Sequence, residues 1–164
     1  MELAEGILIQ IKSNTPQKSS AIRRAAIYSV EGCGSLKEEC YLIDSEEIKL
    51  LTGSRYNIGI GSLVAMSNGM RRTNHIAIDD DQASADFVKN RFVSRAHAYI
   101  AYSEREGFLL YVEPSGTRMA QKRTHIIRGA EQLELNNPIV GIPLRDGDYI
   151  VLSKHVHLLF KQED

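Results

Sequence analysis

The chain has 164 residues, 43% of them hydrophobic and 25% charged, which is enough for one hydrophobic core and too few for two. Twenty Lys and Arg side chains face 21 Asp and Glu, so no charge excess draws the chain to nucleic acid or to an anionic membrane. No apolar run approaches the roughly 20 residues that cross a bilayer, and the N-terminus lacks the basic region of a secretory signal. We therefore expect a single domain over residues 1–164, located in the cytoplasm.

The first third of the chain gives weaker structural signals than the rest. Residues 7–11 alternate as a strand does, residues 12–20 have the composition of a loop or linker, and residues 21–30 fit either a strand or a helix. Residues 44–47 precede an apolar group and predict a capped short helix. Residues 1–53 are therefore an N-terminal extension or the first strands of a sandwich, and residues 54–164 form the core.

Strand periodicity dominates from residue 56 onward. Short apolar and β-branched runs are separated by turn residues, which predicts strands over 56–61, 75–78, 97–102, 107–112, 149–152 and 155–160. The polar turn at 103–106 predicts a hairpin, Asp146-Gly147 a second turn, and 139–140 an extended approach to it. Short strands at this spacing favour an all-β sandwich or barrel, with short helices limited to the N-terminal region and the loops.

Five short motifs occur in an order that is similar to that of the forkhead-associated (FHA) domain family. They are Ile58-Gly59-Ile60, Ile76-Ala77-Ile78-Asp79, the stretch from Ser94 to Ile100, Ser115-Gly116-Thr117, and the stretch from Leu144 to Ile150. The third motif, Ser-Arg-Ala-His-Ala-Tyr-Ile, matches the family almost fully. The resemblance implies a β-sandwich of two sheets whose loops at one end bind a phosphothreonine peptide.

The resemblance also implies roles for single residues. Ser94 would donate its hydroxyl to a phosphate oxygen, Arg95 would flank the peptide, and Thr117 would contribute its hydroxyl or backbone. Gly59, His97 and Gly116 would support the shape of the site. Alternatively, Ser94 to His97 is a chance pattern before a strand, and residues 114–117 are an ordinary turn.

Two residues depart from the family pattern. Ile60 stands where the family has an arginine, and Ser115 where it has an asparagine whose amide holds the peptide backbone. Three arginines are candidates to replace the lost cation: Arg71 and Arg72, which follow the extra segment 62–70, and Arg91. The alternative for Arg71 and Arg72 is that they keep a hairpin tip soluble.

Other combinations of residues give no sign of catalysis, a metal or a cofactor. His155 and His157 share a strand face without a nearby carboxylate or cysteine, and residues 79–81 lack the glycine and glutamate of a calcium loop. No Gly-x-Ser-x-Gly elbow is present. We expect Cys33 and Cys40 to be free thiols.

These observations favour a non-catalytic protein–protein interaction module of signalling that binds a phosphothreonine peptide. The alternative is a degenerate FHA-like domain that binds an unphosphorylated protein partner, or its own copy, without phosphate. Neither hypothesis requires nucleic acid, a membrane, a metal or a cofactor, and neither sets the oligomeric state.

Overall fold

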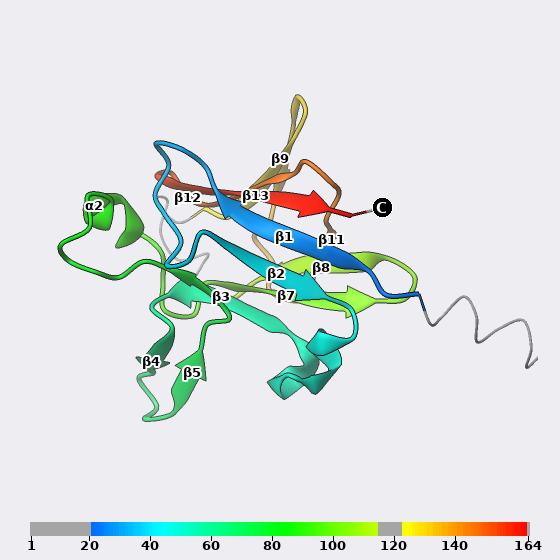
Figure 1. The fold of residues 1–164 in the computed structure, drawn as a ribbon, viewed down its shortest axis with the longest axis horizontal. Coiled ribbons are helices and arrows are strands. Elements are labelled where there is room, and N and C mark those ends of the chain that lie inside the picture. The colour runs from blue at the N-terminus through cyan, green and yellow to red at the C-terminus, as the bar shows by residue number, and fades with distance from the viewer. Residues whose placement is uncertain (1–20, 115–122, 164) are drawn as a thin grey trace, which may run out of the picture.

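The computed structural model describes residues 21–114 and 123–163, which fold as two β-sheets packed face to face (Figure 1). The six-stranded sheet has the order β10 (Glu131–Glu134), β9 (His125–Arg128), β12 (Tyr149–Ser153), β13 (Val156–Gln162), β1 (Arg24–Ser29), β2 (Cys40–Asp44). The five-stranded sheet has the order β11 (Ile142–Pro143), β8 (Gly107–Val112), β7 (Ala98–Ser103), β3 (Tyr56–Ile60), β6 (Ile76–Ile78).

The core lies between the two sheets. Alternate residues of each strand point inward, so that Ile58, Ile100 and Leu110 of one sheet meet Ile27 and Leu158 of the other, all fully buried. The prediction of an all-β sandwich is confirmed, and the six strands expected after residue 56 are all present within one or two residues of their predicted bounds.

The strand pairings bring three of the sequence motifs to one end of the five-stranded sheet. Strand β3 pairs in parallel with β6, with Ile60 opposite Ile78, and antiparallel with β7, with Ile58 opposite Ala98. The last residues of β3 and β6 and the first residue of β7 are therefore neighbours. The segment from Ser94 to His97 leads into β7 at this end, which we call the motif end.

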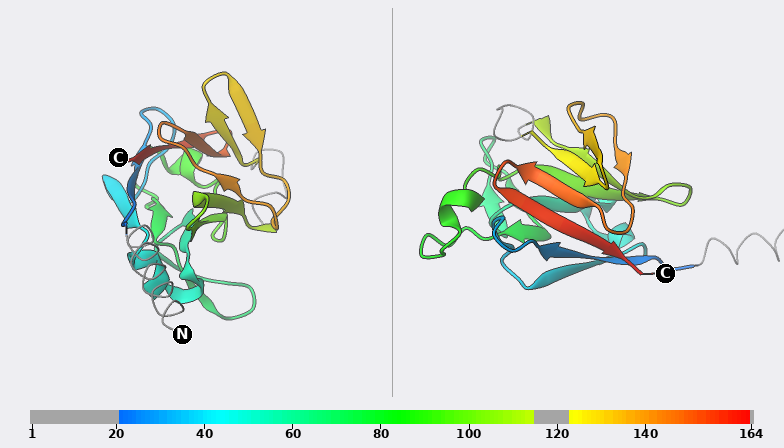
Figure 2. Two further views of the ribbon diagram at one scale, coloured as in Figure 1. Left: turned by 90° about the vertical axis from the view of Figure 1, so that its right-hand side faces the viewer. Right: turned by 90° about the horizontal axis from the view of Figure 1, so that it is seen from above.

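Two hairpins extend from opposite sides of the sandwich (Figure 2). One consists of β4 (Leu63–Ala65) and β5 (Arg71–Thr73), inserted between β3 and β6 as a two-stranded sheet. The other consists of β9 and β10, which the sequence did not predict because Glu-Gln-Leu-Glu of β10 has no apolar alternation to reveal a strand.

The N-terminal part of the described chain contributes two strands to the six-stranded sheet. Residues 24–29 form β1 between β13 and β2, which resolves the ambiguity between strand and helix. The predicted short helix is η1 (Glu47–Leu50), a 3₁₀ turn followed by η2 (Thr52–Ser54). The Asp44 carboxylate caps this turn by accepting hydrogen bonds from the backbone N–H groups of Glu46 and Glu47. The strand and linker predicted at 7–11 and 12–20 lie outside the described residues.

The prediction of an extended segment at 139–140 is wrong. Ile139 and Val140 are exposed and belong to a turn in which the Val140 N–H donates to the Asn137 carbonyl. The strand lies instead at β11, where Ile142 and Pro143 pair with β8. The long loop before Ser94 contains one helical turn, α2 (Phe87–Asn90). Cys33 and Cys40 are free thiols, as predicted.

Candidate functional site

A buried histidine fixes the turn from Ser94 to His97. The His97 side chain is fully buried, and its Nδ1 atom accepts a hydrogen bond of 3.0 Å from the Ser94 backbone N–H. Because Nδ1 accepts, the ring proton is on Nε2, which donates to Thr124 Oγ1 at 3.0 Å. Both ring nitrogens of His97 are thus used to hold the turn, and neither is available as a base for the Ser94 hydroxyl.

The same turn packs tightly against strand β3. The Ile60 N–H donates to the Ser94 carbonyl at 3.1 Å, and the His97 N–H donates to the Ile58 carbonyl at 3.1 Å. Gly59 lies between these two contacts, where a Cβ atom would stand 2.2 Å from the Arg95 carbonyl oxygen. Only glycine leaves room for the turn at this distance.

Asn74 connects the turn to the inserted hairpin, although no sequence pattern marked it. Its side chain is buried, and its Nδ2 atom donates to the carbonyls of Gly61 and Arg95, both at 2.9 Å. Its Oδ1 atom accepts from Arg72 Nε at 2.8 Å. One amide therefore joins the end of β3, the turn from Ser94 to His97, which we call the motif turn, and β5.

The two adjacent arginines of β5 have different environments. Arg72 is buried, and its guanidinium donates to Glu113 Oε2 at 2.6 Å and to the carbonyls of Ile58 and Ala98 at 3.2 and 3.0 Å. Burial lowers the pKa of the Arg72 guanidinium, and the hydrogen bond to Glu113 opposes this effect. This geometry gives Arg72 an internal role, which differs from the predicted role of a phosphate ligand.

Arg71 is exposed, as expected for its position next to a buried residue on a strand. Within the described parts of the chain its side chain has no hydrogen-bond or ion-pair partner. Of the two arginines, Arg71 is therefore the one whose charge remains for a ligand.

A pocket of about 580 Å³ lies beside the motif turn, and we call it the β5 pocket. Its walls come from four segments: residues 52–57 of η2 and the start of β3, residues 66–75 around β5, Ala96 of the motif turn, and Glu113 after β8. The polar groups on which its chemistry depends are Arg55, Asn57, Arg71, Arg72, His75 and Glu113. Sequence reasoning missed Arg55, His75 and Glu113, because they are far apart in the chain and belong to none of the motifs.

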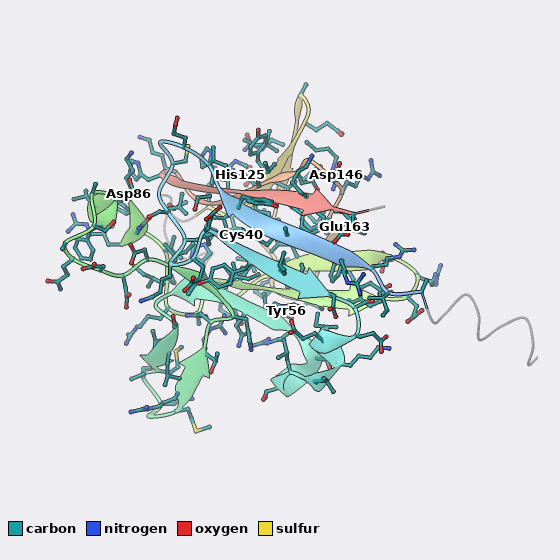
Figure 3. The ribbon with its side chains drawn as sticks, viewed as in Figure 1. Cys40, Tyr56, Asp86, His125, Asp146 and Glu163 are labelled. Carbon is teal, nitrogen blue, oxygen red and sulfur yellow. The ribbon has the colours of Figure 1, made fainter. Side chains whose placement is uncertain are left out.

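Tyr56 ties the helical segment beside this pocket to the sheet (Figure 3). Its hydroxyl donates to a Glu47 carboxylate oxygen of η1, and its ring meets His75 edge-on with centroids 6.0 Å apart. Burial raises the pKa of the Tyr56 phenol, with the Glu47 hydrogen bond acting in the same direction. The phenol therefore stays protonated and keeps η1 in place.

The remaining predicted site residues fall in three places. Ser94 is buried in the motif turn, and Arg95 is exposed and donates from Nη1 to the Ala65 carbonyl of β4 at 2.7 Å. Arg91 lies over the Phe92 ring, with 5.7 Å between its guanidinium carbon and the ring centroid, and does not line the β5 pocket. The predicted contacts of Ser115, Gly116 and Thr117 lie outside the described residues.

Ile60, at the position of the family's arginine, packs against the core. Two residues after β6, the Asp80 Oδ1 atom accepts a hydrogen bond of 2.9 Å from Lys37 Nζ, and this hydrogen bond lowers the pKa of the Asp80 carboxyl. In residues 21–114 and 123–163 no three His, Cys, Asp or Glu side chains are grouped as metal ligands would be. No helix in those ranges is long and apolar enough to cross a membrane.

No protein-family model and no curated protein matches the chain. Among solved structures it is similar to the Slr1951 protein from Synechocystis sp., with 14% identity, 87% of this chain and 98% of that chain covered, and a TM-score of 0.40. It is also similar to the FHA domain of a hypothetical protein from Arabidopsis thaliana, with 18% identity, 87% of each chain covered, and a TM-score of 0.47. Similarities at this level do not assign the chain to a family.

Proposed function

We propose that this chain is a non-catalytic interaction module that binds a phosphothreonine peptide at the motif end of the sandwich. The observation that carries the proposal is the Ser94–His97 turn, which a buried histidine and the Gly59 contact hold in one shape. A rigid turn at a strand end, next to an arginine without a protein partner in the described chain, suits the recognition of a phosphate dianion.

The phosphate needs hydrogen-bond donors and positive charge. In the proposal Ser94 donates its hydroxyl, Arg71 supplies the cation that Ile60 cannot, and Arg95 flanks the peptide. Ser115 and Thr117 complete the site, and their contacts are predicted from the sequence alone. The phosphate-binding groups are positioned by the hydrogen bonds of Arg72 and Asn74 and by the close contact at Gly59.

The test is fluorescence anisotropy of the full chain with one peptide library in three matched forms: phosphothreonine, phosphoserine and unmodified threonine. The phosphothreonine form should bind selectively, and Ser94→Ala should weaken that binding by about 1 to 3 kcal/mol, the value of a hydrogen bond to a charged group. Ser103→Ala, at the opposite end of β7, is the control and should leave the affinity unchanged. Equal binding of all three forms would contradict the proposal.

One observation favours the alternative, a domain that binds an unphosphorylated partner. Ile60 is apolar, and Arg72 uses its guanidinium inside the fold, so two of the positions that could hold the phosphate cation do not offer one. Under this alternative Arg71→Ala and Ser94→Ala leave the affinity for a phosphothreonine peptide unchanged. Under the main proposal both substitutions lower it.

A further inference from the structure

The β5 pocket carries an excess of positive charge on its walls. Arg55, Arg71 and Arg72 line it against a single carboxylate, Glu113. That carboxylate already accepts hydrogen bonds from Arg55 Nη2 at 3.1 Å and from Arg72 Nη1 at 2.6 Å. The chain as a whole has a net charge of −1, so the positive charge here is a local feature and not a consequence of a basic protein.

His75 adds a neutral donor to the same walls. Its Nδ1 atom accepts a hydrogen bond of 2.9 Å from the Asn57 backbone N–H, which places the ring proton on Nε2. In the described ranges this Nε2–H group has no acceptor. Burial, and after it the charge of Arg72, lowers the pKa of His75, so the ring stays neutral near neutral pH.

Arg55 is held in position while most of its donors stay available. Its guanidinium carbon lies 4.1 Å from the centroid of the Tyr99 ring, and Tyr99 stacks on Tyr111 with centroids 5.0 Å apart. Among residues 21–114 and 123–163 only its Nη2 atom has a hydrogen-bond partner, Glu113, so the other N–H groups can reach a ligand. Together the walls offer hydrogen-bond donors and positive charge. Glu113, the charged acceptor among them, already accepts hydrogen bonds from Arg55 and Arg72.

We propose that the β5 pocket binds a carboxylate side chain from an acidic segment of a partner protein, through Arg55, Arg71 and His75. A carboxylate supplies negative charge and acceptor oxygens for the unused donors of Arg55, Arg71 and His75, and a volume of about 580 Å³ admits a Glu or Asp side chain with neighbouring peptide. Arg71 belongs to both proposed sites, whereas Arg55 and His75 have no part in the proposed phosphate site, so this binding requires neither Ser94 nor a phosphate.

The proposal is tested on the full chain with two fluorescein-labelled peptides of alternating glycine, one with Glu and one with Gln at the other positions. The Glu peptide should bind about ten-fold or more tightly than the Gln peptide, as expected for charge-assisted hydrogen bonds. Its binding should weaken as salt is raised from about 50 mM to about 500 mM. Equal affinities, or no binding of either peptide, would overturn the proposal.

Variants separate the pocket from the rest of the surface. Arg55→Gln and Arg71→Ala should each weaken binding of the Glu peptide several-fold, whereas Arg105→Ala, an exposed arginine of the β7–β8 turn, should not. Thr52→Glu places a repelling carboxylate on the exposed rim without removing a contact, and serves if Arg55→Gln destabilises the fold. Full binding by Thr52→Glu would contradict the proposal.

Ser94→Ala distinguishes this site from the proposed phosphate site. The Glu peptide should bind this variant as it binds the unmodified chain, even where phosphothreonine binding is lost. If Ser94→Ala lowers both affinities equally, the carboxylate occupies the phosphate site, and the β5 pocket is not a separate one.

Discussion

The Ser94–His97 turn and the β4–β5 hairpin are neighbours that are held to the sandwich in different ways. The turn is fixed by a buried histidine, a buried amide and a backbone contact that only glycine permits. The hairpin exposes most of its side chains, and Arg72 is the buried one among its strand residues. The turn is thus held by several buried contacts. The hairpin has one buried side chain, the Arg72 guanidinium, and its other links to the sandwich include the hydrogen bonds from Arg95 to the Ala65 carbonyl and from Asn57 to the Thr73 carbonyl.

The largest expected effect comes from removing that guanidinium. Arg72→Met leaves Glu113 with only Arg55 and removes the Arg72 hydrogen bonds to the carbonyls of Ile58 and Ala98, so we expect a loss of about 3 kcal/mol in the free energy of unfolding. Arg71→Met is the matched control on the same strand and should change it by less than about 0.5 kcal/mol. Urea unfolding of both variants measures the difference, and similar losses would mean that Arg72 does not anchor the hairpin.

The next effect concerns the turn. Gly59→Ala would bring a Cβ atom within 2.2 Å of the Arg95 carbonyl oxygen, which is backbone and cannot rotate away. We expect a loss of about 2 to 3 kcal/mol from this overpacking. Gly69→Ala in the hairpin tip meets no atom within 4 Å but has φ of +84°, so it should cost only about 1 kcal/mol. The reverse order in thermal or urea unfolding would contradict this account.

The turn also shows what the sequence could predict. The strands around it follow a local period of two, and Gly59, Ser94 and His97 sit in short motifs, so their placement at one end could be expected before the structure was known. The hydrogen bonds of Asn74 and Arg72 could not be predicted in this way. Arg72 and Glu113 are 41 residues apart, and only the pairing of β3, β6 and β7 brings such positions together.

Residues 131–140 show the opposite case. The apolar pair Ile139 and Val140 looked like a strand and is exposed, while the polar β10 looked like a loop and pairs with β9. In both segments the tertiary environment, and not the local composition, decides the structure. The β5 pocket belongs to this class, because its walls come from four separate segments.

The third effect is the removal of the histidine that holds the turn. His97→Ala leaves the Ser94 N–H and the buried Thr124 hydroxyl without the hydrogen bonds that they make to the ring, and opens a small cavity. We expect a loss of about 2 kcal/mol in the free energy of unfolding. His97→Gln, which can restore one of the two bonds, should lose less. Equal losses for both variants would show that the hydrogen bonds of His97 contribute little.

The smallest effect is a pH dependence at His75, which lies where the hairpin joins β6. Burial and the Arg72 charge lower its pKa in the folded chain, and the Glu47 carboxylate opposes them. The unfolded chain therefore binds a proton at higher pH than the folded chain does, so stability is full above about pH 6.5 and falls as the pH drops through that value. The urea midpoint should thus decrease between about pH 7.5 and about pH 5, and decrease less in His75→Gln. Burial also lowers the pKa of His157, which keeps part of the slope in that variant. An identical slope in the two proteins would show that His75 does not contribute, and that the hairpin junction is insensitive to protonation.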